Sequence, residues 1–137
     1  ARDTGRMRVT GEISDQYKFL TPSLRNVSQS GPYGHDGAYA SLQAVVRHHF
    51  DPIAALNAYD PTQAVFLDIQ SPDDWRVVAD SEELARISAA NELTPIALGD
   101  DDLSDLVAFL HSLTDTGATA GRLGVPAKVP SGLPVDQ

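Results

Sequence analysis

The sequence predicts a mainly α-helical protein with long loops and an extended C-terminal tail. Apolar residues recur at three- and four-residue spacing in residues 42–50 and 100–114, the pattern of an amphipathic helix. A capping box opens a further helical stretch at about residues 81–91. Alternation typical of a strand is confined to residues 6–10. At 137 residues and 42% hydrophobic, the chain could form one modest domain or a large piece of one.

The first half of the chain is predicted to be mostly loop. Residues 1–16 are expected to be extended, and residues 17–40 hold two prolines and three glycines among few periodic apolar positions. Loops of that length in compact domains usually carry function or link domains. Ser41 is a good N-cap for the helix at 42–50, and Pro52 is expected to end it.

The second half alternates irregular segments with two helices. Residues 51–79 contain three prolines and are expected to be irregular, with one short helical turn. Asp80 begins the next helix as the first residue of the capping box. Three aspartates at 100–102 lie in the first turn of the last helix, where the helix dipole favours negative charge. The tail at 117–137 has three prolines, four glycines and no periodicity, so it should run extended over another surface.

Composition excludes several classes of function. The formal net charge is −9, so nucleic-acid binding is not expected, because no basic face would meet the phosphates. No apolar run approaches 18 residues, so no membrane span is expected. There are no cysteines, which excludes disulfides, thiolate chemistry and C-x-x-C-H haem attachment within these residues. The N-terminal residues lack the apolar core of a signal peptide, so an export signal would lie outside this sequence.

His49 is the leading candidate for chemistry. Leu42, Val45, Val46 and His49 follow the spacing that puts residues on one helix face, which aims His49 at an apolar interior. His48 would point about a hundred degrees away, toward water. A histidine on an apolar face is usually a core residue with satisfied hydrogen bonds. Because neutral imidazole is also a good iron ligand, metal or haem ligation is the functional alternative.

Two further residue types could act in a site. His35 lies between glycines in a predicted turn, where it is either a loop histidine bonded to Asp36 or to backbone, or a general acid–base group. Arg25 and Arg47 could bind a carboxylate or a haem propionate, because a guanidinium forks onto planar anions. The other interpretation of each arginine is an ordinary surface ion pair.

Several motifs, taken together, resemble one known family. They are FLTPSLRNV at 19–27, PYGHDG at 32–37, SLQAVV at 41–46, DLVAFLHSLTD at 105–115 and VPSGLPV at 129–135. In this order they resemble the C-terminal haem domain of the bacterial di-haem cytochrome c peroxidases and their MauG-like relatives. The resemblance implies a cytochrome-c-like haem domain fragment. Residues 1–116 would form the C-terminal part of that domain, with 51–97 as an insertion, and 117–137 would pack on a partner domain or chain.

The resemblance also implies a function. Such a protein is part of a di-haem c-type peroxidase or MauG-like oxidase in the periplasm, with hydrogen peroxide as the oxidant. His49 falls where the peroxidases have a methionine and MauG a tyrosine, the distal ligand of the electron-relay haem. Ser30 and Pro32 fall where main-chain carbonyls bind Ca²⁺ between the domains. Arg25 and His35 are the further candidates for haem contact, and His35 for catalysis.

The sequence departs from the family in having no C-x-x-C-H motif. Activity would therefore need an upstream haem-bearing domain or a companion chain with that motif, and a small electron-donor protein is a further expected partner. One alternative is a non-catalytic interaction subunit in which His49 is a plain core residue. Another is a small non-haem metal protein that uses His35, His48 and His49.

Overall fold

The computed structural model describes residues 3–65, 75–119 and 131–132, and the regular structure of this part is helical. Apart from an isolated antiparallel bridge between Tyr33 and Tyr39, the described residues form no strand. The predicted mainly α class with long loops is thus confirmed, and it is consistent with a cytochrome-c-like helical fragment. Most of the tail predicted at 117–137 lies outside the described residues.

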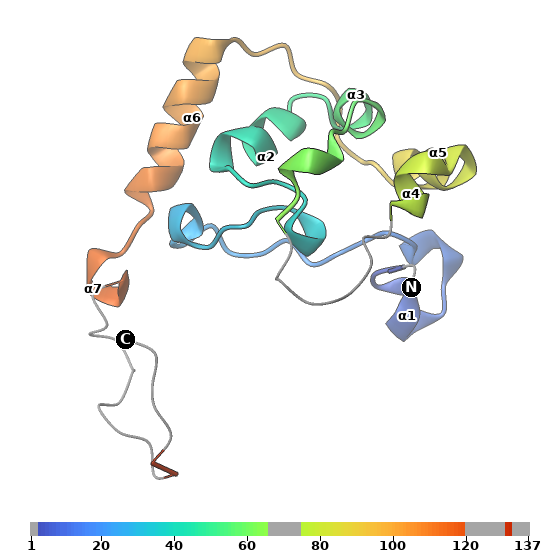
Figure 1. The fold of residues 1–137 in the computed structure, drawn as a ribbon, viewed down its shortest axis with the longest axis horizontal. Coiled ribbons are helices and arrows are strands. Elements are labelled where there is room, and N and C mark those ends of the chain that lie inside the picture. The colour runs from blue at the N-terminus through green and yellow to red at the C-terminus, as the bar shows by residue number, and fades with distance from the viewer. Residues whose placement is uncertain (1–2, 66–74, 120–130, 133–137) are drawn as a thin grey trace.

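Seven α-helices and four 3-10 helices make up the described part of the chain (Figure 1). They are α1 (Met7–Thr10), η1 (Ile13–Asp15), η2 (Val27–Gln29), η3 (His35–Gly37), α2 (Leu42–His48), α3 (Pro52–Asn57), η4 (Pro61–Gln63), α4 (Arg76–Ala79), α5 (Ser81–Ala89), α6 (Asp100–Ser112) and α7 (Thr116–Thr119). The three predicted helices correspond to α2, α5 and α6, each with its end within about two residues of the prediction.

The predicted helix starts are confirmed by their hydrogen bonds. The Ser41 side chain accepts from the backbone N–H of Ala44 at 3.2 Å, which caps α2. The Asp80 carboxylate accepts from the N–H groups of Glu82 and Glu83, which caps α5. These side chains satisfy donors that have no partner inside the helix, so the local sequence fixes where both helices begin.

Two predictions about the loops are wrong. The expected extended segment at residues 6–10 is the short helix α1, which Gly11 closes at φ 74° by donating its N–H to the Met7 carbonyl. One turn of helix is too short to show a helical period in the sequence. The second error concerns residues 51–79, because Pro52 follows the end of α2 as expected but also opens the helix α3. Asp51 caps this second helix through the N–H of Ala54, and proline is well suited to a first helical position. Residues 51–79 thus hold more helix than the single turn predicted.

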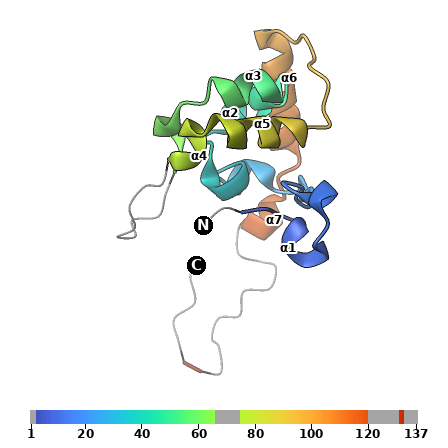
Figure 2. The same ribbon diagram turned by 90° about the vertical axis from the view of Figure 1, so that its right-hand side faces the viewer.

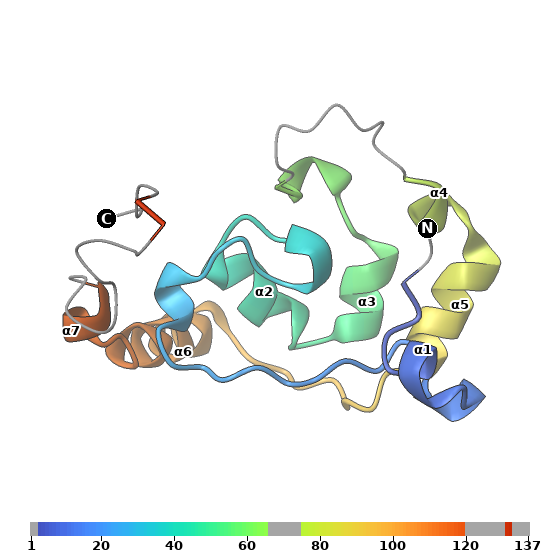
Figure 3. The ribbon, with the colours of Figure 1, turned by 90° about the horizontal axis from the view of Figure 1, so that it is seen from below.

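The longer helices pack in series. Helix α6 contacts α2, α2 contacts α3, α3 contacts α5, and α5 contacts α4. Figure 3 shows the same order from below, with α6 on one side of α2 and α3 on the other. Figure 2 looks along this row, with α5 in front. Helix α2, which ends at His48, therefore lies between α6 and α3.

The apolar core is small. Only Leu42, Leu103 and Val107 form the buried cluster of the described residues, and six half-buried side chains pack against it: Val27, Tyr33, Val45, Val46, Phe50 and Leu110. Large apolar side chains elsewhere stay exposed, including Leu20 at 93% and Phe109 at 55%. A core of this size offsets little of the entropy lost on folding.

We therefore expect the isolated 137-residue chain to fold poorly on its own. Short helices depend on tertiary packing for stability, and here that packing rests on a cluster of three buried apolar side chains. Circular dichroism of the purified chain, without haem or partner, should show a broad and shallow thermal transition. A sharp, cooperative melt at high temperature would contradict this expectation.

A buried carboxylate fastens the N-terminal segment to α5. Glu83 is 1% exposed, accepts a hydrogen bond from the Tyr17 hydroxyl, and pairs with Arg86 at 2.9 Å. A buried charge needs such partners, because its desolvation is otherwise costly.

Within the described residues, no helix is both long and apolar enough to cross a membrane.

Candidate functional site

His49 follows the last residue of α2 as its C-cap, and its side chain is exposed. The ring Nδ1 lies 2.7 Å from the carbonyl oxygen of Val45, one turn back. Because a carbonyl can only accept, Nδ1 must donate the proton of this bond. The neutral ring then carries its lone pair on Nε2. No described residue forms a hydrogen bond with Nε2.

The predicted environments of the two adjacent histidines are reversed in the structure. Leu42 is buried and Val45 half-buried, as the helical spacing predicts, but His49 on the same face is exposed. His48, expected to be wetter, is half-buried. The helical period describes only α2 itself, whereas the loop before α2 supplies the side chain of Tyr39, which covers His48.

Two tyrosines and the two histidines form an aromatic cluster at the end of α2. The Tyr39 hydroxyl lies 2.8 Å from Nδ1 of His48. The Tyr59 ring meets the Tyr39 ring edge-on at 5.7 Å, and its hydroxyl donates to the Ala38 carbonyl at 2.6 Å. On the other side, the His48 and His49 rings meet edge-on at 5.5 Å. The cluster thus connects the loop, α2 and the segment after α3.

Both partners of the bond between Tyr39 and His48 are neutral near pH 7. Burial, with a smaller effect from His49, lowers the pKa of His48, so its ring is neutral near pH 7. Burial also raises the pKa of Tyr39, with a smaller effect from Tyr59, so the phenol keeps its proton. The bond therefore joins two neutral groups, and the tautomer of His48 decides which of them donates.

His35 lies apart from this cluster, in the turn η3. Its Nε2 is 3.2 Å from an Asp3 carboxylate oxygen and 3.3 Å from one of Asp36, and its ring is 4.1 Å from that of Phe19. The backbone N–H of Gly5, and then the charge of His35, lower the pKa of Asp3. These contacts match the interpretation as a loop histidine, which here fastens the turn to the N-terminal segment.

The three-histidine metal alternative is not supported. In the part of the chain that the structure describes, no three His, Cys, Asp or Glu side chains are grouped so as to hold a metal ion. His48 is committed to Tyr39 through Nδ1, and His35 to two carboxylates. A non-haem metal site made of His35, His48 and His49 therefore has no geometric basis here.

Asn26, which the sequence analysis did not single out, joins two of the family-like motifs. Its backbone N–H donates to the Leu113 carbonyl at 3.1 Å, and its side-chain oxygen accepts from the Asp115 N–H at 2.6 Å. It adopts φ 59°, a left-handed conformation that asparagine tolerates better than most residues. The loop motif at 19–27 is thereby fixed to the end of α6. In the sequence, the only signal for this contact was an asparagine directly after Arg25, a residue type that favours left-handed turns.

The remaining candidate residues lie on exposed loops. Arg25 pairs with Asp115 at 2.6 Å, which corresponds to the surface ion-pair interpretation. Ser30 closes η2, and its N–H and hydroxyl both donate to the Val27 carbonyl, at 3.2 and 3.0 Å. Neither the Ser30 carbonyl nor that of Pro32 accepts a hydrogen bond from a described residue. Within the described part of the chain, no hydrogen bond therefore competes with a cation for these two oxygens.

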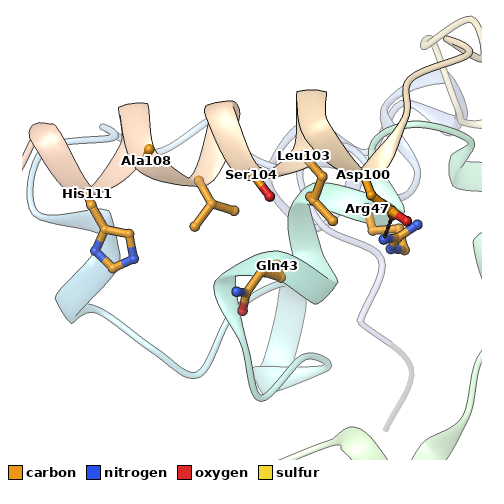
Figure 4. A pocket seen from close by; sticks show the side chains of 8 residues that line it. Gln43, Arg47, Asp100, Leu103, Ser104, Ala108 and His111 are labelled. Atoms are coloured by element: carbon orange, nitrogen blue, oxygen red, sulfur yellow. Dashed lines mark hydrogen bonds and ion pairs between the residues drawn. The ribbon is translucent and has the colours of Figure 1, made fainter.

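A groove of about 550 Å³ runs between α2 and α6 (Figure 4). It is lined by Gln43, Arg47, Asp100, Leu103, Ser104, Val107, Ala108 and His111. Arg47 and Asp100 form an ion pair of 2.6 Å at one end, and His111 lies at the other. Arg47 is thus also engaged in an ion pair, and the groove does not include His49.

Comparison with known proteins agrees with the motifs. The chain is 30% identical over 120 residues to "Methylamine utilization protein MauG" of Methylophilus methylotrophus, covering 86% of this chain and 27% of that protein. It is 31% identical over 115 residues to "Cytochrome-c peroxidase IdrP1" of Denitromonas iodatirespirans, covering 84% and 23%. A 42-residue stretch, 31% of the chain, is 48% identical to 13% of "Cytochrome c551 peroxidase" of Nitrosomonas europaea.

The chain spans about a quarter of the length of the curated relatives that it matches over most of its own residues. No protein-family model matches it. No solved structure matches it either. Relatives named MauG, and one named cytochrome-c peroxidase, are nevertheless about 30% identical to it over most of its residues. The chain therefore belongs to the family of MauG and the di-haem cytochrome c peroxidases, and it corresponds to a part of those proteins.

Proposed function

We propose that this chain is part of a di-haem c-type peroxidase or MauG-like oxidase, and that it completes the electron-relay haem site by supplying His49 as the distal ligand. The observation that carries this proposal is the state of the His49 ring. Its Nδ1 proton is held by the Val45 carbonyl at 2.7 Å, so the lone pair lies on an exposed Nε2. A metal-ligating histidine almost always donates its other ring N–H in this way.

The residues present fit an axial haem ligand. The bond to Val45 fixes the tautomer and restrains rotation of the His49 ring, and the His48 ring packs edge-on against it with the ring centroids 5.5 Å apart. The exposure of His49 favours a ligand role over the alternative in which His49 is a plain core residue. Haem c, when bound, would supply the one-electron chemistry and the reaction with hydrogen peroxide.

The other parts of the proposal concern what surrounds the chain. Haem attachment needs a C-x-x-C-H motif, which this sequence lacks, so an upstream domain or a companion chain would provide it. The periplasm is the proposed compartment, and a small electron-donor protein is a proposed partner. The roles of Arg25 and His35 as haem contacts, and of His35 as a catalytic group, are still predictions. In the structure both side chains pair with carboxylates.

Three measurements on the intact native protein test the function. Mass spectrometry should find a polypeptide with two C-x-x-C-H motifs, either continuous with this chain or bound to it. The ultraviolet-visible spectrum should show haem c, and the particle should oxidise a reduced electron donor when hydrogen peroxide is added. A particle without haem absorption would instead favour a non-catalytic interaction subunit, for which the exposed Leu20 and Phe109 are suitable contacts.

A calcium site at Ser30 and Pro32 is a separate expectation. Ca²⁺ prefers oxygen ligands, backbone carbonyls among them, and both carbonyl oxygens are without a hydrogen bond from the described residues. Removing calcium from the intact protein with a chelator should loosen the contact between its haem domains and lower its activity, and added Ca²⁺ should restore both. Elemental analysis without calcium, together with unchanged assembly and activity after chelation, would exclude the site.

A further inference from the structure

We propose that Tyr39 is a positioning residue for His49, and that it acts through His48. This inference rests on the proposed function, in which Nε2 of His49 binds iron. The three side chains form a continuous path. The Tyr39 hydroxyl contacts His48 at 2.8 Å, and the His48 ring contacts the His49 ring edge-on at 5.5 Å. Tyr39 would thereby limit the orientations of an exposed ligand.

Tyr39 is itself firmly held. It is 9% exposed, and its backbone N–H and C=O both pair with Tyr33, at 2.9 and 2.8 Å. The Tyr59 ring packs against it, and Tyr59 in turn bonds the carbonyl of Ala38 next to Tyr39. A side chain fixed by a backbone bridge and a neighbouring ring can serve as a fixed reference for the more mobile groups that it contacts.

His48 transmits this restraint because of its place in the chain. It is the last residue of α2, and the C-cap residue His49 follows it directly. The bond from Tyr39 fixes the His48 ring, which forms a wall beside the His49 ring. His49 is then restrained on two sides, by this wall and by the Val45 carbonyl at Nδ1. Without the Tyr39 hydroxyl only the second restraint would remain.

The affinity of an external ligand measures how firmly His49 is held. Cyanide can bind the relay haem only by displacing His49, so its apparent affinity rises when the bound orientation of His49 is less favoured. In the intact ferric haem protein, Tyr39→Phe should tighten cyanide binding at this haem about fivefold, which corresponds to the loss of one hydrogen bond of about 1 kcal/mol. The readout is the loss of the near-infrared magnetic circular dichroism band of a haem with two nitrogen ligands.

Tyr33→Phe is the matched control. The Tyr33 hydroxyl also forms a half-buried hydrogen bond, to the Ser28 carbonyl at 3.2 Å, but it does not contact His48. This variant should bind cyanide as the unmodified protein does. His48→Ala removes the other end of the restraint. It should leave the haem low-spin and raise cyanide affinity by a similar factor. If Tyr39→Phe does not fold, His48→Ala still tests the same restraint.

The His49→Ala background separates this inference from the proposed function. With His49 absent, Tyr39→Phe should no longer change cyanide affinity, because no ligand remains to be positioned. A persisting effect in that background would overturn the inference. The inference is also overturned if His49→Ala makes the haem high-spin while Tyr39→Phe and His48→Ala bind cyanide with the affinity of the unmodified protein. If His49→Ala itself leaves the low-spin haem intact, the assigned ligand and this inference both fail.

Discussion

Replacing His49 with alanine should convert the relay haem of the intact protein from low-spin to high-spin. His49 is exposed, and the bond from Nδ1 to the Val45 carbonyl leaves the lone pair of the neutral ring on Nε2. Removing the ring would leave the iron with its proximal ligand alone, and a five-coordinate or water-bound haem is high-spin. Electron paramagnetic resonance and the visible spectrum of the ferric protein measure the change directly.

His49→Met gives a second, quantitative outcome at the same position. A methionine ligand raises the potential of a c-type haem relative to other axial ligands, so the relay haem should shift upward on the order of a hundred millivolts. A redox titration followed by absorbance measures this shift. His111→Ala is the control, because His111 is exposed on α6 at the far end of the groove from Arg47 and Asp100. A low-spin spectrum that survives His49→Ala would mean that another residue ligates the iron.

The sequence predicted the longer helices from two kinds of signal, a capping side chain and the spacing of apolar residues. In α2 and α5 a capping side chain marks the first residue, and in α6 the three-to-four spacing runs from Leu103 to Leu110. Helices of about one turn, such as α1, carry neither a readable period nor a side-chain cap. Their formation depends on backbone closure by residues such as Gly11, which a pattern of apolar residues does not report.

The site was predictable only in part, because it is made by contacts between segments. Helical spacing singled out His49, but it placed the ring in the interior, whereas the structure shows it exposed. The partner that distinguishes His48 from His49 is Tyr39, which reaches α2 from a preceding loop held by Tyr33. Asn26 joins the loop to the end of α6 across about ninety residues. No local period or spacing encodes such contacts.

Leu103→Ala should produce the largest loss of stability within this part of the protein. Leu103 is 7% exposed and belongs to the three-residue cluster with Leu42 and Val107 that joins α6 to α2. Truncating a buried leucine costs about 2–5 kcal/mol, through lost burial and the cavity left behind. In a core this small no other buried cluster of the described residues can compensate. We therefore expect the opening free energy of α2 and α6 to fall by that amount.

Native-state hydrogen exchange on the intact haem protein measures this opening helix by helix. Leu106→Ala is the matched control, since Leu106 lies one turn from the same core on α6 but is 39% exposed, and its truncation should cost about 0.5 kcal/mol. Amide protection in α2 and α6 should therefore drop steeply in Leu103→Ala and little in Leu106→Ala. Equal protection in the two variants would show that the haem or a partner surface, and not the Leu42–Leu103–Val107 cluster, holds α6 against α2. The same comparison bears on the proposed role of His49, because a helix α2 that opens more often holds its C-cap residue in place less often.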